Sequence, residues 1–173
     1  FLTRWGHLAE DGSFNAGARV LMHVQIQEIF TTELVLEGVF EELDLPTFFG
    51  VLTAMCNELP RAAHVVGTKQ YRGLARHIDR IRHSDIVVEA EETSNFPVVW
   101  DPNMIPFGVA WARGKSLGEV LQGVSCNTDI SGDLVGAFRR AKDLAGQLSW
   151  SRRGSCAAVQ YSAVRCGTVQ CGA

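Results

Sequence analysis

The chain has 173 residues, of which 46% are hydrophobic and 20% charged, a composition that excludes a disordered protein and allows one sizeable core. A formal charge of -3 argues against a domain that coats nucleic acid indiscriminately. Neither a membrane-spanning apolar run nor the layout of a signal peptide occurs, so we expect a cytoplasmic protein with no membrane partner.

The chain begins without Met, and we expect a fragment of a longer protein. Residues 8–15 are predicted to form the end of a helix and a polar turn at Asp11-Gly12. We assign residues 1–19 to a linker or the end of a preceding domain and residues 20–150 to the main domain. For residues 151–173 we expect a disordered tail.

Two hydrophobic helices follow. Residues 25–40 repeat apolar side chains at helical spacing and carry glutamates on the other side. Asp44 then offers an N-cap, Pro46 is tolerated in a first turn, and a second helix is predicted to run until Pro60. The tight corner between them predicts a helical hairpin.

The segment 69–82 is predicted to be an amphipathic helix. Its apolar side chains take one side, and four cations form a stripe on the other: Lys69, Arg72, Arg76 and Arg80. Aligned cations repel one another, so phosphates or an acidic partner surface opposite them would explain the pattern. The alternative is a solvated face that the acidic helix partly neutralises.

Residues 86–95 are predicted to form a brief strand and an acidic loop. Asp101 and Pro102 supply an N-cap and a first-position proline for a helix that ends at Gly114. We expect Pro106 to remove one backbone hydrogen bond near the start of that helix.

Two helices are predicted in the last third of the chain. Ser116 and Glu119 form a capping box, so a short helix should run to about residue 122. Ser131 or Asp129 can cap a longer one with an apolar seam. Arg139 and Lys142 flank a stripe on its polar side, which consists of Gly136, Arg140, Asp143 and Gln147.

Sequence motifs for catalysis are missing. No phosphate-binding GxxxxGK motif, DExH-type box or dinucleotide fingerprint occurs, so we expect no ATP hydrolysis and no cofactor in this chain. The histidines lack metal-ligand spacing, and the odd number of cysteines, five, contains no CxxC pair. We therefore expect no catalytic and no metal-binding residues.

Three segments in the same order carry a resemblance to a known family. They are TELVLEGVFEEL at residues 32–43, which follows Ala18-Arg19-Val20, then VAWARGKSLGEVL at 109–121 and GDLVGAFRRAKDL at 132–144. Over residues 17–149 the chain resembles the C-terminal helical domain, DSHCT, of the Ski-like and HelY-like DExH-box RNA helicases. The residues before Gly17 are similar to the end of the winged-helix domain that precedes it in that family.

The resemblance implies an all-α bundle of antiparallel helices that packs on the two RecA-like motor domains of the same parent chain. It implies that the helix at 131–148 faces single-stranded RNA, with Arg139 and Arg140 contacting phosphate or base and Asp143 near the strand or paired with Arg140. ATP and Mg²⁺ would act only in the parent helicase. DNA is an alternative to RNA as the bound strand.

Two other functions compete with this RNA-contacting accessory domain. One is a structural or protein-docking bundle with no nucleic-acid affinity of its own. The other is a helix-turn-helix DNA binder built from residues 116–148. Asp129 and Asp133 at the start of its recognition helix would face phosphates badly, which counts against it.

Overall fold

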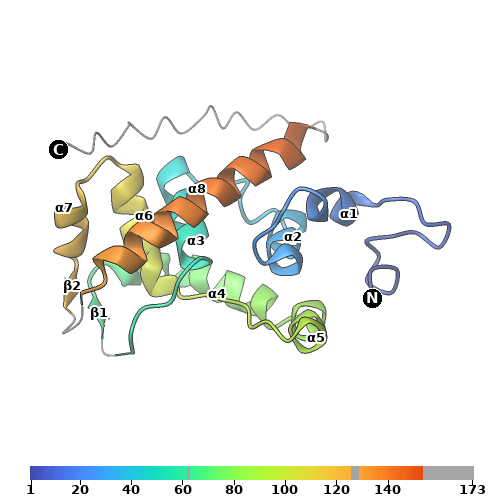
Figure 1. The fold of residues 1–173 in the computed structure, drawn as a ribbon, viewed down its shortest axis with the longest axis horizontal. Helices are drawn as coiled ribbons and strands as arrows, with labels where there is room; N and C mark the ends of the chain where they lie inside the picture. The colour runs from blue at the N-terminus through green and yellow to red at the C-terminus, as the bar shows by residue number, and fades with distance from the viewer. Residues whose placement is uncertain (62, 126–128, 154–173) are drawn as a thin grey trace.

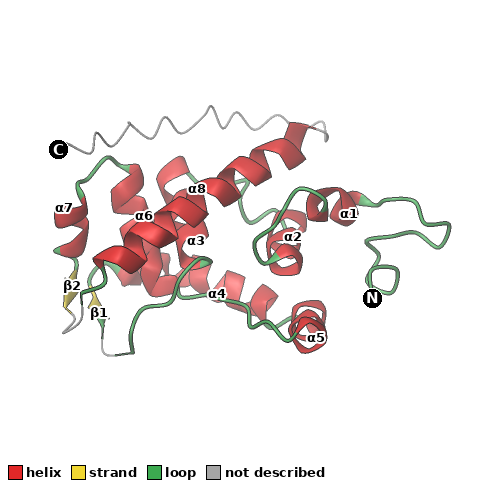
Figure 2. Cartoon of the chain, in the orientation of Figure 1, coloured by secondary structure: helices red, strands yellow, loops and turns green. Residues whose placement is uncertain are grey.

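The computed structural model describes residues 1–61, 63–125 and 129–153, and these residues form a mainly helical domain, as predicted (Figures 1 and 2). The elements in chain order are α1 (Ala16–Leu21), α2 (Glu28–Leu36), α3 (Leu45–Ala54), β1 (His64–Val65), the 3-10 helix η1 (Thr68–Tyr71), α4 (Arg72–Arg82), α5 (Asp85–Ser94), the 3-10 helix η2 (Pro102–Met104), α6 (Ile105–Ala112), α7 (Leu117–Leu121), β2 (Val124–Ser125) and α8 (Ser131–Arg153).

Helix α3 is the centre of the core, because every residue from Phe48 to Ala54 is buried. It begins as predicted: the Asp44 carboxylate accepts a hydrogen bond from the Thr47 N–H at 3.1 Å. Pro46 lies in the first turn, where an N–H would have no partner within the helix. Helix α6 packs along α3, and α8 crosses it on another side (Figure 1).

The contact between α3 and α6 is made by backbone, through Gly50 and Gly108. A Cβ atom on Gly108 would lie 2.7 Å from the Gly50 Cα, and one on Gly50 would lie 2.8 Å from the Ile105 carbonyl oxygen. Both distances are below any normal contact. Any larger side chain at either position would therefore force the two helices apart.

Helix α8 is fixed on this pair by its apolar side. Leu134, Ala137, Ala141 and Leu144 are fully buried. The Phe138 ring stacks on Trp111 of α6, with ring centroids 4.8 Å apart. The predicted apolar seam is therefore confirmed, and the other side of α8 is held in a defined orientation.

The prediction of a strand and loop at residues 86–95 is wrong, because this segment is helix α5. Ile86 and Val87 are both buried against the core. A helix can bury a short β-branched run in this way as well as a strand can. Glutamate and alanine, which favour helices, make up most of the following turn. Asn95 ends the helix in the left-handed conformation, at φ 57°.

The first helical hairpin has shorter helices than expected. Gln27 at φ 49° and Gly38 at φ 69° adopt left-handed conformations on either side of α2, so the helix cannot extend through residues 25–40. Likewise α3 ends at Ala54, well before Pro60.

The segment 101–114 starts with a separate 3-10 turn. The Asp101 carboxylate accepts the Asn103 N–H at 2.9 Å, which confirms the predicted cap. Because η2 precedes α6, Pro106 falls in the first turn of α6. At this position an N–H would have no partner within α6 itself. Gly114, at φ 82°, ends the segment as predicted.

The capping box before α7 is confirmed. The Ser116 N–H donates to the Glu119 carboxylate at 2.8 Å, and the Glu119 N–H donates to the Ser116 hydroxyl at 3.4 Å. The antiparallel pair β1–β2 was not predicted, because two-residue strands have no readable periodicity.

The N-terminal residues form a hairpin-like turn and contact the helices. The turn predicted at Asp11-Gly12 is confirmed, with Gly12 at φ 81°, but an isolated bridge between Leu8 and Phe14 replaces the expected helix end. Helix α1 spans residue 19, where we expected a boundary. Over the described part of the chain, no helix is long and apolar enough to cross a membrane.

Candidate nucleic-acid interface

Arg139 lies on the side of α8 that faces away from the core. It is exposed, and with about 100° between successive residues it points opposite to the buried Ala141 and Leu148. Ser131 starts the helix, with its N–H bonded to the Asp129 carboxylate at 2.9 Å. The sequence placed Arg139 on the polar side, and the structure shows that it has no carboxylate within 4.0 Å among the described residues.

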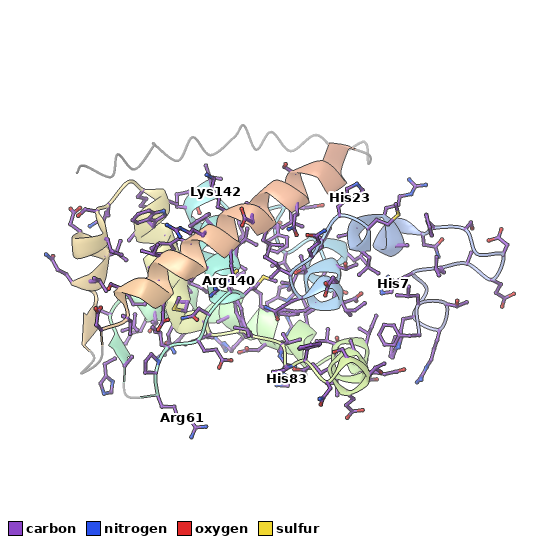
Figure 3. All side chains as sticks on the ribbon, viewed as in Figure 1. His7, His23, Arg61, His83, Arg140 and Lys142 are labelled. Atoms are coloured by element: carbon purple, nitrogen blue, oxygen red, sulfur yellow. The ribbon has the colours of Figure 1, made fainter. Side chains whose placement is uncertain are left out.

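Arg140 has a different position from its neighbour. Its Nη2 and Nε donate to the Cys56 carbonyl oxygen at 2.7 and 3.2 Å, so its guanidinium is held against the end of α3 (Figure 3). Burial raises the pKa of the adjacent Cys56 thiol to about 11, and the charge of Arg140 lowers it only in part. Cys56 is therefore a protonated, buried thiol rather than a nucleophile.

The end of α3 is a junction of distant segments. The Ala54 carbonyl accepts the Asp101 N–H at 3.0 Å. The Met55 carbonyl accepts from the Gln27 amide, which also donates to Val99, and the Cys56 carbonyl accepts from Arg140. The last carbonyl groups of a helix have no hydrogen-bond partner within the helix. Arg140 therefore supplies the remaining hydrogen bond at the end of α3.

Two other members of the predicted stripe on α8 also differ from one another. The Gln147 amide oxygen accepts the Gln25 N–H at 2.8 Å, so Gln147 fixes the loop before α2. Asp143 is exposed and makes no ion pair with Arg140 within 4.0 Å. The outward surface of α8 therefore presents Arg139 and Asp143, whereas Arg140, although exposed, and Gln147 form hydrogen bonds with other parts of the domain.

Lys142 is a further cation of this surface. It is exposed and leaves α8 on the side opposite Arg140 (Figure 3). From the sequence we placed Lys142 beside the stripe but not among the binding residues. Its signal was its spacing of three residues from Arg139, which puts both on neighbouring positions of one helix face.

The second predicted set lies on a separate part of the domain. Helix α4 packs on α2, α5 and η1, whereas α8 packs on α3 and α1. All four predicted cations are exposed: Lys69, Arg72, Arg76 and Arg80. The structure therefore gives two cationic surfaces rather than one continuous site.

Another polar contact joins the N-terminal segment to α2. His7, only 2% exposed, places its Nε2 3.5 Å from the Glu33 carboxylate. Burial lowers the pKa of His7, and burial followed by the charge of Glu37 raises the pKa of Glu33. No sequence signal indicated this pair. In the described residues no His, Cys, Asp and Glu side chains are grouped so as to hold a metal ion.

Comparison with protein families identifies the class of this helical domain. A family model matches residues 11–155, and it makes the chain a C-terminal accessory domain of a DExH-box helicase, which is not a catalytic domain. The family is the DSHCT (NUC185) domain, and the chain belongs to it. The resemblance to the DSHCT domain of DExH-box helicases is thereby confirmed, and the match extends beyond residues 17–149 at both ends. No individual curated protein matches the chain.

Proposed function

We propose that this domain contacts the RNA strand that its parent helicase translocates, and that it packs on the two RecA-like motor domains. The observation that carries the proposal is the outward face of α8, where Arg139 and Lys142 project into solvent without a carboxylate partner among the described residues. ATP and Mg²⁺ would act in the motor domains, and the domain itself would guide the strand.

The rigidity of α8 supports a role in guiding a strand. Its buried side fills the core, and Arg140 and Gln147 tie it to the end of α3 and to the loop before α2. Because the helix is already fixed, its backbone needs no further ordering when the cations on it bind phosphate. The attraction to phosphate is electrostatic and independent of sequence, as a moving strand requires.

Glycines on α8 allow close approach. A Cβ atom built on Gly132 or Gly146 would meet no atom within 4 Å, so both positions are open to solvent. Asp143 lies on the same face, where its carboxylate repels phosphate. We therefore assign phosphate contacts to Arg139 and Lys142, and to Asp143 a hydrogen bond from a base or a ribose hydroxyl.

Fluorescence anisotropy with a single-stranded RNA tests the proposal. The 173-residue chain is compared with the double variant Arg139→Gln, Lys142→Gln at several salt concentrations. The loss of two phosphate contacts should weaken binding and reduce the slope of log K against log salt by about 1.4. The matched control, Arg113→Gln with Lys115→Gln, removes two exposed cations near the start of α7 and should leave the slope unchanged.

A protein-docking bundle without nucleic-acid affinity is the competing function. It predicts no salt-dependent binding of RNA by the chain at any salt concentration. Equal slopes for the chain and the α8 double variant would also contradict the proposed contact, because two phosphate contacts cannot be removed without releasing fewer counterions.

A further inference from the structure

A second row of cations lies on α4 and on the 3-10 helix η1 that precedes it, away from α8. We call this row the α4 cationic face, and it consists of Lys69, Arg72, Arg76 and Arg80. Ile78 and Ile81 are buried on the other side of the helix. Because the arginines recur every fourth residue, they stay on one side of α4, with Arg76 directly opposite the core.

Among the described residues, the cations of the α4 cationic face form no ion pair. The ion pair of this region joins Arg82 to Glu91 at 2.7 Å, and Arg82 belongs to the core side of the helix. The one acid of α4, Asp79, accepts the Trp100 indole N–H at 2.7 Å. Among the described residues, no carboxylate lies within 4.0 Å of the four cations.

Acidic side chains limit the surface at one end. Glu33 of α2 and Glu37, which caps the end of α2, line a shallow pocket together with His77 and Arg80. A polyanion is repelled there, so its favourable path over the helix runs from Arg80 toward Lys69.

The spacing of the arginines favours a strand of phosphates. Four residues of helix advance about 6 Å, a step comparable to one nucleotide of an extended strand. Each guanidinium can form two parallel hydrogen bonds with one phosphate. The spacing of the positive charges along this row therefore matches the spacing of the phosphates along an extended strand.

The lack of apolar side chains argues against a protein partner. A protein interface has an apolar centre and a polar rim. The large exposed hydrophobic side chains of the described residues include none between Lys69 and His83. The α4 cationic face therefore has the polar side chains of a protein interface but lacks the apolar centre.

We infer that the α4 cationic face binds the phosphate backbone of a second segment of RNA, separate from the segment at α8. The inference rests on the proposed function for the identity of the strand. Each surface would hold its own stretch of nucleotides, so a strand long enough to reach both would bind more tightly than a short one.

Salt titrations of RNA binding test this with variants of the whole chain. The triple variant Arg72→Gln, Arg76→Gln, Arg80→Gln removes three cations from the helix without lowering its helical propensity. With a long single-stranded RNA the slope of log K against log salt should fall by about 2. The single variant Arg76→Gln should lower it by about 0.7.

A matched control separates the local effect from net charge. The triple variant Arg4→Gln, Arg19→Gln, Lys115→Gln makes the same change in charge at exposed positions outside α4 and η1. It should keep the slope of the unmodified chain. A control that loses as much slope as the α4 variant would overturn the inference, since general attraction would then explain both.

The outcomes distinguish the two surfaces. If the α4 variant keeps the full slope while the α8 double variant loses it, the α4 inference is wrong and the proposed function stands. If only the α4 variant loses slope, the contact at α8 is wrong and the α4 inference stands. Polyglutamate that displaces the long RNA at equal charge concentration would overturn the inference in favour of an acidic protein partner.

Discussion

Replacing Arg140 should destabilise the domain far more than replacing Arg139. Arg140→Ala removes two charge-assisted hydrogen bonds to the Cys56 carbonyl, at 2.7 and 3.2 Å. Such a bond contributes about 1.5–3 kcal/mol, and a cation at a helix C-terminus contributes about 0.3–1 kcal/mol. Arg140 is exposed, so water competes for these hydrogen bonds and screens the charge, and we expect a total of only about 1–2 kcal/mol. For a chain of this length that lowers Tm by roughly 2–8 °C.

Thermal and urea unfolding followed by circular dichroism measure this difference. Arg139→Ala is the matched control, since the side chain is exposed and should change the free energy of unfolding by less than about 0.5 kcal/mol. Arg140→Lys keeps the charge but loses the paired donors, so it should fall between the two. Equal stability of the Arg139→Ala and Arg140→Ala variants would refute the role of Arg140 at the end of α3.

Two more predictions follow from buried positions. Gly108→Ala should lower the free energy of unfolding by about 1–3 kcal/mol, because the new methyl group meets the Gly50 backbone. The control is Gly73→Ala, which should instead stabilise α4, because a Cβ atom there meets no other atom. Lowering the pH through 6.5 should reduce stability, because the unfolded chain takes up a proton at His7 that the folded chain, with its lowered pKa, does not. Tm measured at about pH 7.5 and about pH 5.5 should fall less in His7→Gln than in the unmodified chain, and an equal fall in both would exclude His7 as the cause. The raised pKa of Glu33 acts in the opposite sense, because the folded chain takes up a proton there before the unfolded chain does.

Local sequence signals predicted the helix ends well. Asp44, Asp101, Ser116 and Gly114 act through neighbours within three residues, so their roles follow from spacing alone. The error at α5 has the opposite cause. Its β-branched run favours a strand locally, and only the packing of Ile86 and Val87 on the core decides for a helix.

The candidate site could be predicted only in part. The sequence shows which residues of the last helix are polar, but not which of them point to another element. Arg140 and Gln147 find partners at Cys56 and Gln25, which are 84 and 122 residues away along the chain. Such contacts depend on how α8 crosses α3, and no periodicity encodes that crossing.

The junction at the end of α3 also sets an order of assembly. Its carbonyl groups receive donors from Gln27, Asp101 and Arg140, so both earlier and later parts of the chain contribute. Contacts that close long loops form late, because the chain must first lose the entropy of those loops. During synthesis, the central helix therefore remains incompletely capped until Arg140 has left the ribosome.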